Sequence, residues 1–323
     1  MYKNKYIAVV IPAYNEERKI KNTLRSVPDY IDQIFVVNDQ STDGTKEKIF
    51  ESITEDSRIS YFELDVNSGV GASIVKGYQE VIKSNCDVAV VMAGDGQMDP
   101  CDLPSLLNPV IEGKCDYAKG NRLLHGDGID HIPKRRLIGN LILSICTKIA
   151  SGYWHVSDSQ GGYTAIGRRA LEEIKWEDCY PRYGCPNDYL VKLNIANMKV
   201  ADVPVKAIYG SEWSSSLKIK SVIFPIATLL CRLFLHRLYR KYVVMNGHPI
   251  VFTYLMFFAS SFFLLLLSLY ILSITIGTGV VPQTALILFV MFLILSVQML
   301  FHAFDMDYRQ NEHLFVFLEN TEQ

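Results

Sequence analysis

The strongest constraint on this chain is a long stretch without charged side chains. Residues 242–304 contain no Asp, Glu, Lys or Arg. A membrane-spanning helix needs roughly 20 apolar residues, so this stretch has room for two. The pattern predicts one span over residues 249–277 and another over residues 281–303, joined by an uncharged turn. The sequence therefore excludes a wholly soluble protein.

Basic residues gather just before the first predicted span. Residues 218–242 mix apolar side chains with basic ones, which predicts a basic amphipathic helix at the membrane interface. A helix of a soluble bundle is the alternative. The turn between the spans carries no basic residue, so the positive-inside rule places residues 1–241 and the tail after Asp305 in the cytoplasm. We expect an integral protein of a cell membrane, bacterial in type, with both termini cytoplasmic, and a homo-oligomer formed through the spans is left open.

Charge and cysteine content argue against several other classes of protein. The 323 residues carry 32 Lys and Arg against 34 Asp and Glu, a net charge of -2, which argues against binding nucleic acid through bulk charge. The seven cysteines form no C-x-x-C pair, so neither a disulfide scaffold nor a zinc ribbon is expected. No signal-peptide pattern opens the chain. We therefore expect reduced thiols and a domain that folds in the cytoplasm.

Up to about residue 210, short apolar runs alternate with segments of helical spacing. Residues 6–11, 34–37 and 87–92 are continuous apolar runs, which is typical of parallel strands buried on both faces. The alternation predicts an α/β fold with a mostly parallel sheet covered by helices. Helices are expected over residues 17–27, 45–52, 70–84, 133–151 and 187–197, and further strands over residues 117–120, 163–166 and 200–208. The last of these is expected at the sheet edge, because Pro204 interrupts its hydrogen bonding.

Polar segments follow the first three predicted strands, and ligands of such sheets bind at the carboxyl ends of the strands. Tyr14 and Glu16 follow the first strand, where they can cradle a nucleoside or simply begin a helix. Asp39, after the second strand, can accept hydrogen bonds from a base or a ribose. Asp43 and Thr45 fit the capping of the next helix better.

The most informative segment follows the third strand and reads Gly-Asp-Gly-Gln from Gly94 to Gln97. Hard divalent cations prefer oxygen ligands, and Mg²⁺ typically shares one or two carboxylates with substrate phosphates. Asp95, helped by Gln97, fits that role, and a polar loop without a ligand is the alternative. A dinucleotide fingerprint is excluded, because Ile74 stands where the third glycine would fall.

Cationic residues follow downstream. Lys119 and Arg122 form one group, and Arg135 and Arg136 form another beside Lys134. Arginine binds phosphate bidentately, but a generic basic surface would have the same composition. Asp158 and Asp188 are the acids of the remaining polar turns.

Four of these segments together resemble family 2 glycosyltransferases with a GT-A fold, of the membrane-anchored type that uses polyprenyl or dolichyl phosphate. Residues 12–16 match P-x-Y-N-E, residues 38–45 resemble D-D-x-S-x-D-G-T, residues 67–72 resemble N-x-G-x-G-x, and residues 94–100 match G-D-G-Q-x-D-P. The order and spacing of the four make the resemblance specific, and it covers nearly the whole chain.

The resemblance implies roles for individual residues. Pro12, Tyr14, Glu16 and Asp39 would bind the nucleotide, Asp95 and Gln97 would hold Mg²⁺ or Mn²⁺ on the diphosphate, and Arg122, Arg135 and Arg136 would receive the acceptor's phosphate. The implied domains are a cytoplasmic GT-A catalytic domain over residues 1–217, basic amphipathic helices over 218–242, a two-helix transmembrane hairpin over 249–304 and a cytoplasmic tail over 305–323.

Three positions depart from the family pattern. Ala93 replaces the first acid of the D-x-D signature, so fewer charges would hold the metal. Asn38 replaces the first Asp of the second motif. Gly139 stands where a serine is expected after the arginine pair, which weakens the assignment of the acceptor site.

The expected activity is inverting transfer of one sugar from a UDP- or GDP-linked donor to a polyprenyl phosphate, such as undecaprenyl or dolichyl phosphate, in cell-envelope glycan synthesis. A phosphate monoester is already largely anionic at pH 7, so it needs no general base. The alternative acceptor is a hydroxyl of a glycolipid or polysaccharide, which does need a base, and Asp188 is the candidate. A non-catalytic membrane scaffold is the third hypothesis, prompted by Ala93.

Overall fold

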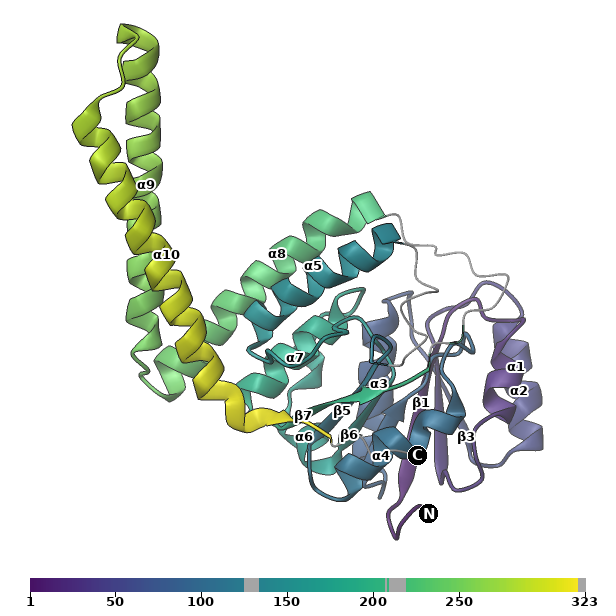
Figure 1. Ribbon diagram of the computed structural model, residues 1–323. Helices are drawn as coiled ribbons and strands as arrows, with labels where there is room; N and C mark the ends of the chain where they lie inside the picture. The colour runs from purple at the N-terminus through teal and green to yellow at the C-terminus, as the bar shows by residue number, and fades with distance from the viewer. Residues whose placement is uncertain (125–133, 207, 209–218, 319–323) are drawn as a thin grey trace. The chain divides into compact units, whose positions relative to one another are not determined.

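The computed structural model describes residues 1–124, 134–206, 208 and 219–318, with the side chains of residues 134–138 and 219–223 left undescribed (Figure 1). The chain forms two compact units. The first comprises Met1–Phe234 together with His313–Gln323, and the second comprises Leu235–Glu312.

A single sheet organises the first unit. Its order is β3-β2-β1-β4-β6-β5-β7-β8 across the described residues. β1 lies parallel to both β2 and β4, and β6 is antiparallel to its two neighbours, so the predicted mostly parallel sheet is confirmed. The strands are β1 Ile7–Ala13, β2 Gln33–Asn38, β3 Ile59–Glu63, β4 Val88–Val91, β5 Tyr117–Asn121, β6 Thr164–Gly167, β7 Val200–Pro204 and β8 Phe315–Val316.

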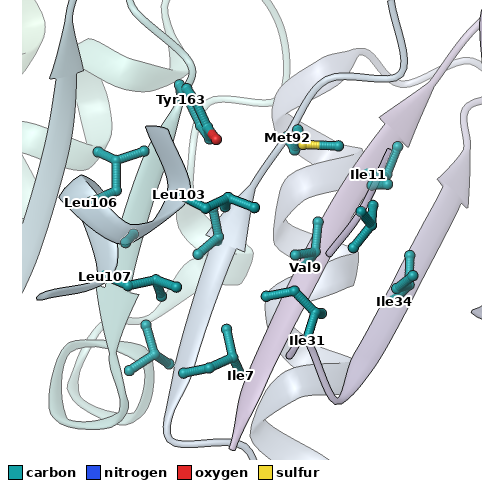
Figure 2. Packing of buried hydrophobic residues seen from close by; sticks show 14 of the residues in the cluster. Ile7, Val9, Ile11, Ile31, Ile34, Met92, Leu103, Leu106, Leu107 and Tyr163 are labelled. Carbon is teal, nitrogen blue, oxygen red and sulfur yellow. The ribbon is translucent and has the colours of Figure 1, made fainter. Parts of the chain in front are cut away.

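Alternate residues of β1 supply the two faces of the sheet. Ile7, Val9 and Ile11 pack into one apolar cluster, shown in Figure 2, whereas Ala8 and Val10 pack into the other. The helices α1 (Ile20–Arg25), α2 (Thr45–Glu55) and α4 (Leu103–Ile111) contribute to the first cluster, and α3 (Val70–Lys83), α6 (Arg168–Glu173) and α7 (Cys185–Ile195) contribute to the second. Continuous apolar strands are therefore buried on both faces, as their sequences predict.

Most predicted elements form close to their expected bounds, and the differences have local causes. β3, α4, α6 and β8 are absent from the predicted elements; α4 carries Pro104 near its start and Pro109 inside it, which obscures the helical pattern. The predicted edge strand is shorter than expected and is not the edge, because β8 pairs with Val200 and Ala201. Pro204 lies beyond the part of β7 that β8 covers, so the ladder loses no hydrogen bond there.

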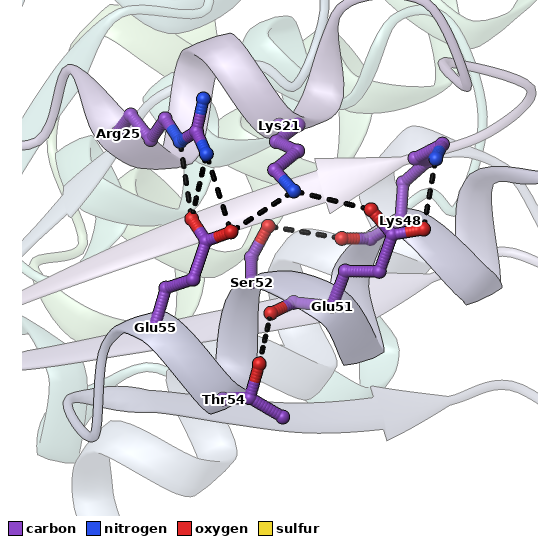
Figure 3. Close-up of polar contacts among 7 residues, drawn as sticks. All are labelled: Lys21, Arg25, Lys48, Glu51, Ser52, Thr54 and Glu55. Carbon is purple, nitrogen blue, oxygen red and sulfur yellow. Dashed lines mark hydrogen bonds and ion pairs between the residues drawn. The ribbon is translucent and has the colours of Figure 1, made fainter.

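Ion pairs join the exposed sides of α1 and α2 (Figure 3). Lys21 contacts both Glu51 at 3.1 Å and Glu55 at 3.0 Å, and Arg25 contacts Glu55 at 2.9 Å. Exposed pairs of this kind contribute little each, typically about 0.2–1 kcal/mol. The buried apolar cluster, rather than this network, therefore accounts for most of the packing of α1 and α2 on the sheet.

The second unit contains two long apolar helices that run side by side, α9 (Ile250–Thr278) and α10 (Gln283–Asn311) (Figure 1). Both are long and apolar enough to span a membrane. Their seam includes a hydrogen bond of 2.8 Å between the buried hydroxyls of Ser260 and Ser296. The two predicted spans are thus present as candidate membrane helices.

The predicted basic helix forms as α8 (Ile219–Arg237), followed by a π-helical segment over Leu238–Met245. One basic side chain of each segment, Arg237 of α8 and Lys241 of the π-helical segment, is buried rather than exposed. Arg237 pairs with Asp307 of α10 at 2.7 Å, and Lys241 donates to Asn311 at 2.8 Å; all four side chains are buried. Because a buried charge needs a partner, this cluster ties the start of the hairpin to its end.

The chain returns to the first unit after the hairpin. β8 follows α10 and lies parallel to β7 in the sheet of the first unit. The chain therefore leaves this unit before α9 and rejoins it after α10.

The packing predicts opposite effects for two Gly→Ala substitutions in helices. A Cβ at Gly77 of α3 would lie 2.2 Å from Val10 Cγ1, whereas a Cβ at Gly139 of α5 (Lys134–Ser151) meets nothing within 4 Å. We expect Gly77→Ala to cost about 1–3 kcal/mol through overpacking, and Gly139→Ala to gain about 0.5–1 kcal/mol through helix propensity. Thermal unfolding of the detergent-solubilised chain checks this; equal midpoints for the two variants would contradict the described packing of α3.

Candidate active site

The polar segments after β1, β2 and β4 meet at one edge of the sheet, as predicted. β1 lies between the other two strands, and its last residues accept backbone hydrogen bonds from both sides. Asp39 N donates to Ala13 O at 2.9 Å, and Gly94 N donates to Pro12 O at 3.2 Å. The three loops therefore form one continuous rim.

Hydrogen bonds also join the loop after β1 to the loop after β2. Asn15 and Gln40 both adopt positive φ, 56° and 57°, which is uncommon for residues other than glycine and concentrates at functional sites. Thr42 N donates to Asn15 Oδ1 at 2.8 Å, and Glu16 N donates to Thr45 Oγ1 at 2.7 Å. Thr45 therefore does not cap α2 with its side chain, as the sequence suggested, but orients the loop that carries Glu16, while Asp43 Oδ1 accepts from Thr45 N at 3.1 Å.

The residues expected to bind the nucleotide occupy different environments. Pro12 is buried within β1, and Glu16 is half-buried and close enough to Asp95, in the loop after β4, for the Asp95 charge to affect its pKa. The Tyr14 ring is 46% exposed at the tip of β1, where a planar ligand can stack on it.

Asp39 has a structural task that the sequence did not reveal. Its side chain is buried, and its two oxygens accept hydrogen bonds from Ser68 N at 2.7 Å and Gly69 N at 2.8 Å. Asn67 Nδ2 donates to Asp39 O at 3.1 Å. Asp39 thereby fixes the N-x-G-x-G turn at the tip of β2. Each carboxylate oxygen has a second lone pair, which leaves Asp39 able to accept from a ligand as well.

Asn38, which departs from the family pattern, is explained by its neighbours. It is fully buried, and its amide Nδ2 donates to Tyr61 OH at 3.1 Å and to Glu63 Oε1 at 3.2 Å. Its Oδ1 accepts from Ser41 N at 3.1 Å. An aspartate at this position would offer no donor and would place a second carboxylate against Glu63.

The loop after β4 presents the residues expected to hold a metal. Asp95 Oδ1 accepts from Gln97 N at 3.1 Å, so the loop curls around this carboxylate. Burial raises the pKa of Asp95, and burial together with the nearby Asp95 charge raises the pKa of Glu16 to about 7. The Ala93 backbone N–H donates to Met98 Sδ at 3.1 Å, and its methyl group offers no ligand.

This donor set fits a hard divalent cation. The carboxylates of Asp95 and Glu16 lie near enough to repel each other, and a cation bound between them would relieve that repulsion. Among the described residues, no group of three or more His, Cys, Asp or Glu side chains forms a metal site. A cation held here would therefore take its other ligands from substrate phosphates and water, as Mg²⁺ typically does.

The cations expected to bind the acceptor are placed unequally. Arg122 forms a bidentate pair with Asp158, with Nε–Oδ2 at 2.7 Å and Nη2–Oδ1 at 3.0 Å. Although burial acts to raise it, the pKa of Asp158 is lowered by the Arg122 guanidinium. The side chains of Arg135 and Arg136 lie outside the described residues, although their backbone belongs to α5.

Lys119 is not the surface cation that the sequence suggested. It is fully buried in β5, and its ammonium donates to Gly161 O. Burial lowers the pKa of Lys119 to about 8. Lys119 therefore anchors the loop before β6, the same loop that carries the Arg122 partner Asp158.

Asp188, the candidate general base, is engaged within the protein. Its side chain is buried, and Oδ2 accepts from Tyr180 N at 2.6 Å and from Lys192 Nζ at 3.0 Å. The loop that it holds also contacts the N-x-G-x-G turn, because Ala72 N donates to Pro181 O at 3.0 Å. Asp188 thus holds the loop at residues 180–181, which in turn contacts the N-x-G-x-G turn.

A small cavity of about 60 Å³ is lined by Gln97 and Met98 of the loop after β4 and by Arg122. Gln97 lines it on one side and Arg122 on another, and the loop before β6 and the segment after β7 complete its wall. We refer to it as the Gln97–Arg122 cavity. A larger hollow of about 430 Å³ lies beside α1 and α2 at the amino-terminal end of β3, and none of the predicted site residues lines it. Gln97 and Arg122 are the predicted site residues that line the smaller one.

The environment of Asn38 gives a direct test. We expect Asn38→Asp to destabilise the chain by about 1–3 kcal/mol, since a buried carboxylate would lose its donors and face Glu63. Glu63→Gln in the same chain should recover much of this loss, because a neutral amide can donate to the new Asp. Unfolding midpoints of the two single variants and the double variant measure the coupling; additive effects would contradict this explanation of Asn38.

Known proteins of similar sequence carry sugar-transfer names. UDP-N-acetylglucosamine–dolichyl-phosphate N-acetylglucosaminyltransferase of Methanococcus voltae is 30% identical over 220 residues, 64% of this chain and 87% of that protein. Polyprenol monophosphomannose synthase of Mycolicibacterium smegmatis is 28% identical over 226 residues, 68% and 84% of the two chains. Undecaprenyl-phosphate mannosyltransferase of Micrococcus luteus is 26% identical over 202 residues, 62% and 82%.

Solved structures share the fold at low identity. Glucosyl-3-phosphoglycerate synthase of Mycobacterium tuberculosis, crystallised with Mn²⁺, UDP and glucosyl-3-phosphoglycerate, is 17% identical with a TM-score of 0.54, covering 72% of this chain and 80% of that one. This likeness supports the expected α/β GT-A fold. The sequence profile described as glycosyl transferase family 2 matches residues 8–175, a range that includes all four motifs. This chain belongs to glycosyl transferase family 2.

Proposed function

We propose that this chain transfers one sugar from a nucleotide-sugar to a polyprenyl phosphate at the cytoplasmic face of a membrane, with inversion at the anomeric carbon. The observation that carries the proposal is the Gln97–Arg122 cavity, which lies between a cation-fitting loop and an arginine, in a chain with two candidate membrane helices. The names of the relatives, which join a sugar to a polyprenyl or dolichyl phosphate, support the acceptor class.

In this proposal, separate groups of residues bind the nucleoside, the metal ion and the acceptor's phosphate. Tyr14 and Asp39 orient the nucleoside at the tips of β1 and β2. Asp95 and Gln97 would hold Mg²⁺ or Mn²⁺, which supplies Lewis-acid stabilisation of the departing diphosphate when bound. Arg122, with Arg135 and Arg136, directs the acceptor's phosphate toward the sugar.

The proposed transfer requires no general base, because no proton has to be removed from the nucleophile. An anionic oxygen of the acceptor's phosphate attacks the anomeric carbon and forms the new C–O bond. The bond between that carbon and the donor's diphosphate breaks, and its electron pair leaves with the nucleoside diphosphate. The acceptor monoester has a second pKa near 6, so no proton has to be removed at pH 7.

A hydroxyl acceptor is the alternative, and the surroundings of Asp188 disfavour it. A general base must reach the substrate's proton, yet the Asp188 carboxylate is buried and already accepts from Tyr180 N and Lys192 Nζ. A non-catalytic scaffold is disfavoured by the preserved donor set at Asp95, Gln97 and Glu16.

The proposal is tested by incubating membranes that contain the chain with a panel of labelled nucleotide-sugars. We expect one donor to place label in the lipid extract, and we expect mild acid to release it, because a glycosyl phosphate ester is acid-labile. Membranes without the chain serve as the control. Label that withstands mild acid would indicate a glycosidic bond to a hydroxyl. If no donor places label in the lipid extract, the result would contradict the proposed transfer and support the non-catalytic scaffold.

Asp188→Asn separates a supporting role from a catalytic one. Asparagine can still accept from Tyr180 N but loses the ion pair with Lys192, so we expect a modest loss of stability and a turnover within about tenfold of the unmodified chain. Lys192→Gln breaks the same ion pair from the other side and is the matched control. Collapse of turnover in Asp188→Asn alone, with donor binding retained, would instead identify Asp188 as a base.

A further inference from the structure

Two residues that line the Gln97–Arg122 cavity have no role in the proposed function so far. One is Lys206, in the segment after β7, and the other is Gly162, in the loop before β6. Neither was singled out from the sequence. Their positions follow from contacts between segments that are distant along the chain.

The segment that carries Lys206 is hydrogen-bonded to the loop after β4 and to the short helix that follows that loop. Lys206 N donates to Asp102 Oδ2 at 2.7 Å, and Ile208 N donates to Gln97 O at 3.3 Å. These two backbone bonds hold Lys206 at the cavity between them. Among the described residues, its ammonium forms no ion pair, whereas Arg122 is paired with Asp158. Lys206 therefore adds a second basic residue to the lining of the cavity.

Gly162 is not required by the backbone. A Cβ at Gly161 would lie 2.7 Å from Gly120 O, and a Cβ at Gly120 would lie 3.0 Å from Tyr163 O, so close approach of two segments explains both of those glycines. A Cβ at Gly162 would meet only Met98 Cε, at an ordinary 3.5 Å, and its φ is not positive. The fold would accept alanine at Gly162; what glycine preserves is open space in the cavity.

The size and charge of the cavity indicate what it holds. Its volume of about 60 Å³ leaves room for a compact group such as phosphoryl. Among the described residues that line it, the charged ones are Lys206 and Arg122, and both are basic. A compact anion therefore complements it better than a sugar.

We propose that the Gln97–Arg122 cavity binds a phosphoryl group, that Lys206 is a further phosphate-binding residue beside Arg122, and that Gly162 keeps the space for it. The inference rests on the proposed function and deepens it. The phosphoryl group can belong to the polyprenyl phosphate acceptor or to the donor's diphosphate. The acceptor is the expected source, because Asp95 and Gln97 already provide for the diphosphate.

Kinetics of the full chain in detergent test this proposal. We expect Lys206→Met to raise the KM for polyprenyl phosphate about tenfold while the KM for the nucleotide-sugar changes less than about twofold. Lys206→Arg should restore much of the affinity. Gly162→Ala should lower kcat/KM for the acceptor by about tenfold or more, because its methyl group occupies the cavity. Gly277→Ala, whose Cβ meets nothing within 4 Å in α9, is the matched control and should behave like the unmodified chain.

A binding measurement makes the result independent of turnover. Binding of a short-chain prenyl phosphate to the unmodified chain should weaken about tenfold in Lys206→Met. A rise in the donor's KM alone would assign the phosphoryl group to the donor and overturn the acceptor assignment. Unchanged KM values and unchanged prenyl phosphate binding would overturn the site altogether. Failure of the unmodified chain to transfer sugar, with Lys206-dependent prenyl phosphate binding intact, would instead refute the proposed function and keep the site.

Discussion

The parallel pairing of β1 with both β2 and β4 is the constraint on which the rest of the first unit depends. It brings three polar loops to one edge, and backbone hydrogen bonds from Asp39 and Gly94 to the end of β1 close the gaps between them. Because a residue shift in a strand moves its side chains to the opposite face, this register also decides which side chains reach the site.

Charge is separated across the site. Asp95 and Glu16 lie at one side, where burial and their mutual repulsion raise the pKa of Glu16 to about 7. Arg122 and Lys206 line the cavity beside this acidic side. Such a distribution suits a cation-bound diphosphate next to a phosphate nucleophile, since each anion then meets its own positive charge. Buried supports such as Lys119 and Asp158 hold the cationic side without exposing further charge.

The sequence predicted the elements whose signal is local. The apolar runs of β1, β2 and β4 and the glycine-containing motifs needed no tertiary information, and the hairpin followed from the charge-free stretch. β3 was missed because its residues are mostly half-buried, and α4 was missed because of its two prolines.

The site residues that the sequence misjudged depend on contacts across long chain separations. From the sequence alone Lys119 resembles a surface cation, but in the fold its ammonium donates to Gly161 O. Asp188 likewise resembles a free acid, but its carboxylate accepts hydrogen bonds from Tyr180 N and Lys192 Nζ. Lys206 gains significance only because Ile208 pairs with Gln97. Gly161 and Gln97 lie far in sequence from Lys119 and Ile208, whereas Lys192 is only four residues from Asp188 in α7 and forms a local ion pair with it.

The central claim is that Asp95 holds a divalent cation on the donor's diphosphate. Equilibrium binding of a nucleoside diphosphate to the detergent-solubilised chain, with and without Mn²⁺, measures this most directly. Mn²⁺ should strengthen binding to the unmodified chain, and Asp95→Asn should abolish that gain while leaving the metal-free affinity unchanged. An equal Mn²⁺ effect in Asp95→Asn, or no Mn²⁺ effect in the unmodified chain, would contradict the account.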